Sequence, residues 1–156
     1  MVFYQLRPRI TPPESSCWTL KASQQGSHLT DHNSRFVVAV VDDEQSILQS
    51  LEYLLESADY AVRLFISVTD LLDSGCLPQL DCLISDIDMP GDDGLELLRL
   101  VHAVRPGLPT ILITGYPDRL KRLPPLGGSN PRAFTKPFPG QEMLAAVSDA
   151  IRHSRA

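Results

Sequence analysis

The fold class of this chain is decided by one segment, LISDIDMPG, at residues 83–91. An apolar strand ends there at Asp86, and a turn that contains Asp, Pro and Gly follows at once. Outward from this segment, apolar runs of strand length recur on both sides, with helical patterns between them. This alternation is typical of an α/β protein whose parallel sheet is covered by helices on both faces.

The expected strands are five apolar runs, at residues 36–41, 60–65, 81–85, 110–113 and 132–135. Apolar residues at helical spacing predict a first helix at 45–58 and a last helix at 140–153. Two further helices are predicted by patterns of the capping-box type, Ser67 with Asp70 and Asp93 with Glu96. A helix at 118–123, the fourth, should be short or distorted, because two prolines and two glycines follow it within 124–128.

The chain has 156 residues, which is enough for one domain with a full core. Residues 1–35 are polar, contain several prolines and lack a sustained apolar period. We interpret them as a flexible N-terminal extension, for which Trp18 is only a weak candidate anchor. The globular domain is then expected to cover residues 36–156. The net charge of −5 gives no support to nucleic-acid binding through a basic surface.

Composition also limits the cellular setting. No apolar run reaches the length of a membrane span, and the N-terminus lacks the apolar core of a secretory signal. The three cysteines, Cys17, Cys76 and Cys82, show no metal-ligand spacing. We therefore expect a cytoplasmic protein with reduced thiols, in which Cys82 is a small apolar residue of the core.

Polar side chains stand where four of the expected strands end. They are Asp42 and Asp43 after the first strand, Asp86 at the third, Thr114 after the fourth and Lys136 after the fifth. Because the carboxyl ends of parallel strands form one edge of the sheet, these groups should meet in one crevice. Carboxylates, a hydroxyl and an ammonium together suit Mg²⁺ and a phosphoryl group. An Asp carboxylate can also act as a nucleophile toward phosphorus.

Each of these residues also has a simpler interpretation. Asp42 or Asp43 alone would be a helix cap, Thr114 an ordinary turn residue and Lys136 a solvated charge. For the side chain of Asp88 we favour the simpler interpretation, a turn former, although its main-chain carbonyl could still meet a metal. The simpler interpretations would all have to hold on successive strand ends of one sheet, and this favours the functional interpretation.

With these features in place, the chain resembles the receiver domain of two-component response regulators. The resemblance covers residues 36–153 and rests on four motifs in order: VDDE (41–44), DIDMPGDDG (86–94), ITG (113–115) and KPF (136–138). It implies a flavodoxin-like, doubly wound, five-stranded parallel sheet of strand order 2-1-3-4-5. It also implies that Asp86 accepts phosphate from the phosphohistidine of a histidine kinase.

The resemblance further implies a role for each matching residue. Mg²⁺ would be held by four aspartates: Asp42, Asp43 as the direct ligand, Asp86 and, through its main-chain carbonyl, Asp88. Thr114 would be the switch hydroxyl and Lys136 the ammonium that binds the phosphoryl group. The Lys136-Pro137 peptide bond would be cis, a form available mainly before proline.

Two departures from the family pattern concern the output of the signal. The family usually has an aromatic switch residue three positions before the lysine, where this chain has Ala133. Phe134 follows it and, because strand side chains alternate, should point to the opposite face and pack as core. Tyr116 is an aromatic near the edge of the sheet that could shield a phosphoryl group instead. The second departure is the broken fourth helix.

Two alternatives stay open from the sequence. Asp86 and Asp88 after an apolar strand also resemble the nucleophile and general acid of haloacid-dehalogenase-like phosphatases, although the acidic pair of that family comes late in the chain. A phosphorylation-independent interaction module on a receiver fold is the other. We favour a stand-alone receiver that is not an enzyme. Its expected partners are a sensor histidine kinase or phosphotransfer protein and an unidentified downstream protein, with no direct nucleic-acid contact and no membrane insertion.

Overall fold

The computed structural model describes residues 35–89, 94–121, 123 and 131–155. Within these residues, five parallel strands form one sheet in the order β2-β1-β3-β4-β5. The strands are β1 (Val37–Val41), β2 (Ala61–Phe65), β3 (Cys82–Asp86), β4 (Thr110–Thr114) and β5 (Arg132–Thr135). The predicted fold class, a doubly wound sheet of order 2-1-3-4-5, is confirmed.

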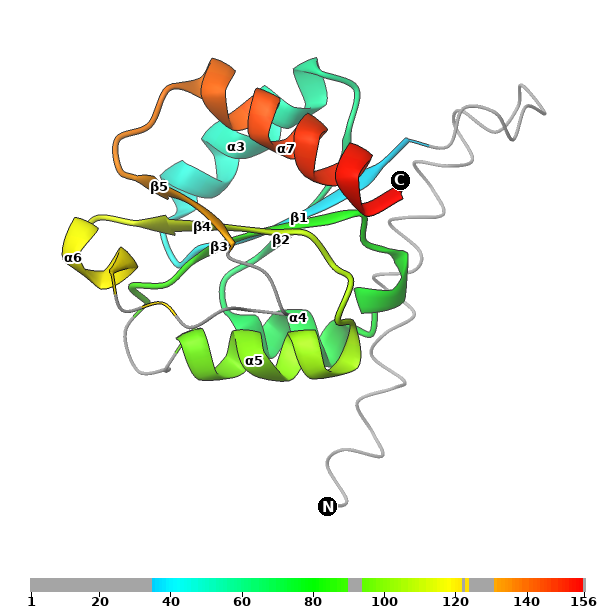
Figure 1. The fold of residues 1–156 in the computed structure, drawn as a ribbon. Coiled ribbons are helices and arrows are strands. Elements are labelled where there is room, and N and C mark those ends of the chain that lie inside the picture. Colours follow the sequence, from blue (N-terminus) through cyan, green and yellow to red (C-terminus); the bar gives the residue numbers. More distant parts are fainter. Residues whose placement is uncertain (1–34, 90–93, 122, 124–130, 156) are drawn as a thin grey trace.

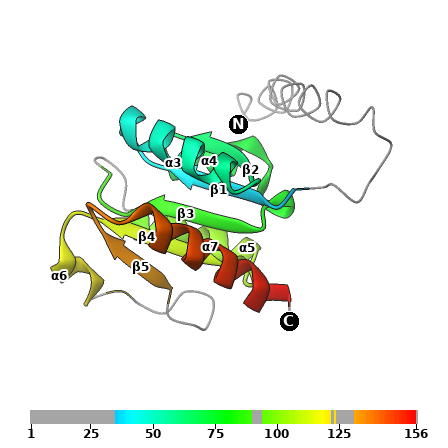
Figure 2. The same cartoon turned by 90° about the horizontal axis from the view of Figure 1, so that it is seen from above.

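Helices cover both faces of this sheet. They are α3 (Gln45–Ser57), α4 (Val68–Ser74), α5 (Gly94–Val104), α6 (Pro117–Leu120) and α7 (Gly140–Arg155), with a short 3₁₀ turn at Leu77–Gln79. Figure 1 shows α3 and α7 on one face, α4 and α5 on the other, and the short α6 beyond the end of β4. The view from above in Figure 2 places α3 and α7 side by side over the strands.

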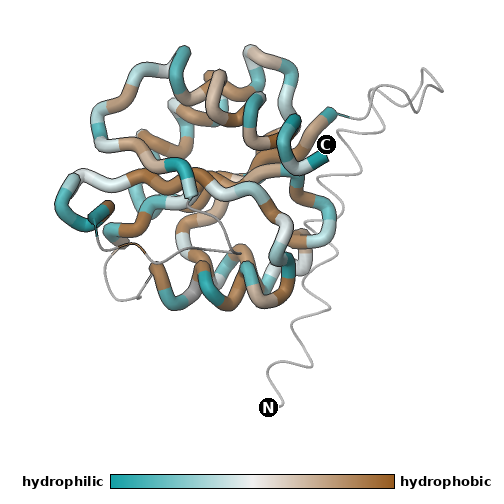
Figure 3. The backbone as a smooth tube through the Cα atoms, viewed as in Figure 1, coloured by the Kyte–Doolittle hydropathy of each residue, from teal (hydrophilic) through white to brown (hydrophobic). Residues whose placement is uncertain are grey.

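The central strands β1, β3 and β4 are buried on both faces because each contributes to two cores. In β1, Val38 and Val40 pack with α3 and α7, whereas Val37, Ala39 and Val41 pack with α4 and α5. Figure 3 shows hydrophobic residues concentrated along the strands in the middle of the fold. Each valine or leucine side chain buried in this way stabilises the fold by about 1.5–3 kcal/mol relative to exposure.

Local signals in the sequence account for several element ends. The Ser67 hydroxyl accepts a hydrogen bond from the Asp70 backbone N–H at 3.0 Å, so the predicted cap of α4 is confirmed. That helix ends at Gly75, whose φ of 73° is easy only for glycine. Asp93, the predicted cap of α5, lies outside the described residues.

Two helices, α6 and α7, differ from prediction by more than one residue at an end. The fourth helix, α6, spans only Pro117–Leu120. It begins one residue earlier and ends three residues earlier than expected. Proline at its first position suits a helix start, where no backbone N–H is needed. The last helix continues to Arg155 rather than ending at 153. The glycine- and proline-rich residues 124–130 and the N-terminal residues 1–34 lie outside the described part of the chain.

Cys82 lies in the core as predicted. Its side chain packs on the α3 and α7 face, and burial raises the pKa of its thiol to about 12. Cys76 is also buried, and Cys17 lies outside the described residues. In the part of the chain that the structure describes, no helix is both long and apolar enough to span a membrane.

Candidate functional site

The polar residues singled out from the sequence do stand on neighbouring strand ends. Asp42 directly follows β1, whereas Asp86 and Thr114 are the last residues of β3 and β4. Lys136 directly follows β5, and its backbone N–H donates a hydrogen bond to the Thr114 carbonyl at 2.8 Å. Because β1, β3, β4 and β5 are consecutive in the sheet, their side chains share one edge.

Three carboxylates gather at the ends of β1 and β3. Asp42, Asp43 and Asp86 each place an oxygen within 4.8 Å of the others. Asp42 and Asp86 are buried, and Asp43 is exposed. Their orientation follows from local turns, because Asp42 Oδ1 accepts from the Glu44 backbone N–H at 2.9 Å and Asp86 Oδ1 from that of Asp88 at 2.8 Å. Carboxylate oxygens at this spacing are suitable ligands for a divalent cation such as Mg²⁺.

Lys136, which follows β5, contacts two of these carboxylates with its ammonium group. Its Nζ atom lies 2.9 Å from Asp86 Oδ2, 3.2 Å from Asp42 Oδ2 and 3.3 Å from Glu44 Oε1. We call Asp42, Glu44, Asp86 and Lys136 the lysine cluster. The Lys136-Pro137 bond is cis, as the resemblance implied.

The lysine cluster contains more negative than positive charge, and the pKa values of two of its members, Asp42 and Lys136, are shifted. Burial raises the pKa of Asp42 from 3.8 to about 6, and the charge of Asp86 adds to this, against the lowering effects of the Glu44 backbone N–H and of Lys136. For Lys136, burial lowers the pKa, but the hydrogen bond to Asp86 and the charges of Asp42 and Asp86 outweigh it, so the net pKa is raised. The ammonium therefore stays charged, while the carboxylates still lack positive charge that a metal ion would supply.

A second group surrounds the hydroxyl of Thr114, which is buried. Thr114 Oγ1 lies 2.8 Å and 2.9 Å from the two carboxylate oxygens of Asp88 and donates its one hydrogen to this carboxylate. Asp88 also accepts from the Gly115 backbone N–H at 2.6 Å and from Arg119 Nη1 at 3.0 Å. We call Asp88, Thr114, Gly115 and Arg119 the threonine cluster. The interpretation of the Asp88 side chain as a mere turn former is therefore wrong, because its carboxylate connects the loop after β3 to the end of β4.

Sequence reasoning missed two participants of these clusters. Glu44 stands next to the acidic pair, and this position was the available signal for its contact with Lys136. Arg119 lies on the short helix α6, and nothing in the local sequence marks it as a partner of Asp88. Its contact depends on how α6 is placed after β4, which local patterns do not determine.

The residues before Lys136 face as expected. Ala133 packs on the α4 and α5 face, and Phe134 packs on the α3 and α7 face. The Phe134 ring meets the Phe138 ring edge to face, with centroids 6.1 Å apart. Phe134 is only partly buried, so the cost of removing its ring should be smaller than for full burial.

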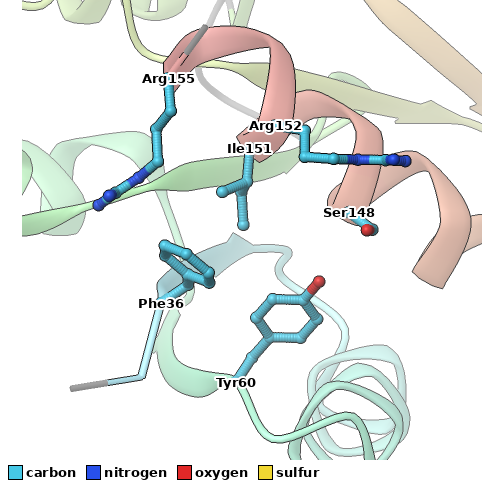
Figure 4. A pocket seen from close by; sticks show the side chains of 6 residues that line it. All are labelled: Phe36, Tyr60, Ser148, Ile151, Arg152 and Arg155. Carbon is cyan, nitrogen blue, oxygen red and sulfur yellow. The ribbon is translucent and has the colours of Figure 1, made fainter. Parts of the chain in front are cut away.

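A hollow of about 240 Å³ lies elsewhere on the domain (Figure 4). It is lined by Phe36, Tyr60, Ser148, Ile151, Arg152 and Arg155. Phe36 and Tyr60 directly precede β1 and β2, so the hollow lies at the amino ends of the strands, on the edge opposite to both clusters. The Arg155 guanidinium covers the Phe36 ring at 4.8 Å from its centre.

Comparison with known proteins agrees with this geometry. The chain matches the response regulator receiver domain over residues 38–148. It is 34% identical over 119 residues to the transcriptional regulatory protein FixJ of Bradyrhizobium diazoefficiens. The aligned segment covers 75% of this chain and 57% of FixJ. It is also 34% identical over 118 residues to the C4-dicarboxylate transport transcriptional regulatory protein DctD of Pseudomonas aeruginosa. That aligned segment covers 76% of this chain and 26% of DctD. The chain thus spans about half the length of FixJ and about a quarter of DctD.

Solved structures show the same likeness. The signal receiver domain of an HD domain-containing protein from Pseudomonas fluorescens Pf-5 matches with a TM-score of 0.69 at 32% identity, over 78% of this chain and 90% of that one. A CheY-like receiver domain protein from Methanospirillum hungatei JF-1 shares the fold, with a TM-score of 0.67 at 24% identity, over 78% of this chain and 98% of that one. The motifs on the carboxyl edge of the sheet and the match over residues 38–148 lead to one conclusion: the chain belongs to the response regulator receiver domain family.

Proposed function

We propose that this receiver accepts a phosphoryl group on Asp86 from the phosphohistidine of a sensor histidine kinase or phosphotransfer protein. The observation that carries the proposal is the position of Asp86. Its carboxylate ends the central strand β3, lies next to Asp42 and Asp43, and accepts a hydrogen bond from Lys136 at 2.9 Å. Among the described residues, this carboxylate combines the acidic group and the ammonium that phosphoryl transfer requires.

The reaction is an exchange of one phosphorus bond for another. A carboxylate oxygen of Asp86 attacks the phosphorus atom, an O–P bond forms, and the P–N bond to the donor imidazole breaks. The leaving imidazole takes up a proton and becomes neutral. Lys136, which already faces Asp86, neutralises charge on the phosphoryl oxygens, and the Thr114 hydroxyl donates a hydrogen bond to one of them.

Mg²⁺ is the cofactor that the acidic group suits. Asp42, Asp43 and Asp86 would hold it together with the main-chain carbonyl of Asp88 and water. The ion would neutralise charge on the acceptor and on the phosphoryl oxygens during transfer. Three carboxylates lie within 4.8 Å of one another and, of the cations that the structure describes, only the Lys136 ammonium faces them, and this excess of negative charge supports a bound cation at this place.

The signal would then pass to a downstream protein by surface contact. The net charge of −5 gives no support to an output through direct nucleic-acid contact. The identity of the partner kinase follows from phosphotransfer profiling against the histidine kinases of the host.

Intact-mass analysis tests the proposal. Protein incubated with Mg²⁺ and acetyl phosphate should gain one phosphoryl group, and chelation of the metal should prevent the gain. Asp86→Asn should remain unlabelled, whereas Asp118→Asn, a change at an exposed carboxylate on α6, should be labelled like the natural chain. Labelling of Asp86→Asn to the same extent would contradict the proposal.

An assay of phosphate-ester hydrolysis, run beside the mass analysis, distinguishes the alternatives. A haloacid-dehalogenase-like phosphatase would hydrolyse a phosphate ester repeatedly, whereas a receiver releases only its own phosphoryl group, so catalytic turnover of an ester would favour the phosphatase. A phosphorylation-independent interaction module would stay unlabelled while folding normally. The order of the acidic residues, with Asp42 and Asp43 before Asp86, and membership of the receiver family favour the receiver.

A further inference from the structure

We propose that Asp88 and Arg119 hold the Thr114 hydroxyl in a resting position, so that Thr114 must leave Asp88 before it can bind the phosphoryl group. Asp88 and Arg119 are positioning residues in this proposal, since they act through Thr114 and do not touch the phosphoryl group. The inference rests on the proposed function, because it concerns the regulation of the same site.

The Thr114 hydroxyl has a single hydrogen, and in the resting structure Asp88 accepts it. That hydroxyl donates to the Asp88 carboxylate, 2.8 Å from Oδ2, and its oxygen accepts from the Tyr116 backbone N–H at 3.0 Å. A hydroxyl has only one hydrogen to donate. Thr114 therefore donates either to Asp88 or to a phosphoryl oxygen, and binding the second means losing the first.

The Asp88 carboxylate is itself held by two further partners. Its carboxylate accepts from the Gly115 backbone N–H at 2.6 Å and pairs with Arg119 at 3.0 Å. The Asp88 side chain is 14% exposed, and hydrogen bonds to a charged group of this kind are stronger than those between neutral groups. Asp88 thus has partners that fix it in place, and it competes well for the hydroxyl of Thr114.

The threonine cluster is also connected to Asp86, the proposed phosphoacceptor. The Asp88 backbone N–H donates to Asp86 Oδ1 at 2.8 Å, so the turn that carries Asp88 is tied to the carboxylate proposed to be phosphorylated. Lys136, by contrast, already contacts Asp86 in the resting structure. Phosphorylation would therefore find Lys136 in place, whereas Thr114 would have to be released from Asp88.

Calorimetric titration with beryllofluoride, a phosphoryl mimic, at saturating Mg²⁺ tests this competition. Asp88→Ala removes the acceptor that holds Thr114, so beryllofluoride should bind roughly tenfold more tightly than to the natural chain. Arg119→Ala leaves Asp88 and Thr114 intact but loosens the anchor, and should tighten binding by about two- to threefold. The matched control is Asp118→Ala on the same short helix, which should leave the affinity unchanged.

A double-mutant cycle separates release of Thr114 from simple charge repulsion. Removing the negative charge of Asp88 would also favour an anionic mimic, and that effect would persist without the Thr114 hydroxyl. In a Thr114→Val background, we expect Asp88→Ala to change beryllofluoride affinity by less than about twofold. A tightening that persists undiminished in this background would overturn the proposal, as would an unchanged affinity of Asp88→Ala with the natural Thr114.

Two further measurements, a Mg²⁺ titration and circular dichroism, distinguish the possible causes of a change in beryllofluoride affinity. Asp88→Ala keeps the main-chain carbonyl that would face Mg²⁺, so Mg²⁺ affinity in the absence of beryllofluoride should be the same for this variant and the natural chain. A parallel change in both affinities would place the Asp88 carboxylate in the metal site and overturn the proposal. If Asp88→Ala does not fold, as judged by circular dichroism, Arg119→Ala alone decides. A natural chain that neither binds beryllofluoride nor gains a phosphoryl group would contradict the proposed function, whereas normal binding with no effect of Asp88→Ala or Arg119→Ala would contradict only this inference.

Discussion

The lysine cluster and the threonine cluster lie on the same edge of the sheet but differ in their balance of charge. In the lysine cluster, one ammonium faces three carboxylates, and two of these, from Asp42 and Asp86, are buried. In the threonine cluster, one carboxylate is satisfied by a hydroxyl, a backbone N–H and a guanidinium. Under the proposed function, the lysine cluster would gain a cation and a phosphoryl group, while the threonine cluster would have to give up an existing contact.

This difference assigns separate tasks to the two clusters. Chemistry at Asp86 depends on groups that are already assembled, so changes in the lysine cluster should affect the rate of phosphorylation and metal binding. The response to phosphorylation depends on whether Thr114 is released, so changes in the threonine cluster should affect the equilibrium between resting and activated forms.

The largest effect should come from Lys136→Met. This change removes the ammonium that faces Asp86 and Asp42, and phosphorylation by a small phosphodonor should slow by on the order of 100-fold. Quenched-flow or timed intact-mass measurements give the rate. Lys121→Met, which removes an exposed lysine paired with Asp118, is the control and should not slow the reaction. A rate for Lys136→Met within a few-fold of the natural chain would mean that the ammonium is not part of the chemistry.

The stability of the metal-free protein should depend on pH through Asp42. The pKa of Asp42 is about 6 in the folded state and 3.8 in the unfolded state, so the folded chain binds a proton more tightly than the unfolded chain. This group's contribution is fully present below about pH 4 and is lost as pH rises through about 6, lowering the free energy of unfolding by on the order of 2 kcal/mol. Denaturant titrations with a chelator at a series of pH values measure it.

Asp42→Asn provides the control for that pH dependence. The variant lacks the titrating carboxyl, so its stability should fall less between pH 4 and pH 7 than that of the natural chain. Mg²⁺ at pH 7.5 should restore stability to the natural chain by neutralising the cluster. Identical pH profiles for the two proteins would show that Asp42 is not the group that titrates.

Phe134→Ala should reduce stability without affecting the switch. The ring is partly buried against Phe138 on the α3 and α7 face, so we expect a loss of about 1.5–2 kcal/mol, less than for a fully buried ring. Thermal or denaturant unfolding measures the loss, and beryllofluoride affinity should stay the same. A stable variant with altered beryllofluoride affinity would instead make Phe134 a part of the switch.

The smallest of these effects concerns the exposed ligand of the acidic group. Asp43→Asn replaces a charged oxygen by a neutral amide, and Mg²⁺ affinity should fall by about tenfold, or about 1.4 kcal/mol. Glu44→Gln is the matched control, because Glu44 contacts Lys136 rather than belonging to the three grouped aspartates, and its Mg²⁺ affinity should change little. Equal Mg²⁺ affinity of Asp43→Asn and the natural chain would remove Asp43 from the metal site.

The comparison of the clusters also explains what could be predicted from the sequence. The lysine cluster was predictable in outline, because Asp42, Asp86 and Lys136 stand at strand ends and parallel strands bring their carboxyl ends together. The strands themselves are marked by apolar runs, and their ends differ from prediction by one residue or less.

The threonine cluster could not be predicted in the same way. Asp88 lies in a loop after β3 and Arg119 on a helix of four residues, and their meeting depends on the path of two loops. Loop paths are set by tertiary contacts that leave no periodic signal in the sequence. Local patterns accordingly predict a turn former at Asp88, whereas its carboxylate connects the loop after β3 to the end of β4.

The central claim, that Asp86 is the phosphoacceptor, is tested most directly by locating the phosphoryl group on the chain. Protein treated with acetyl phosphate and Mg²⁺ is reduced with borohydride, which converts an aspartyl phosphate to homoserine, and then digested and mapped by mass spectrometry. We predict homoserine at position 86 and unmodified aspartate at positions 42, 43 and 88. Homoserine at any of those three positions in place of 86, or at no position in a chain that has gained phosphate, would contradict the assignment.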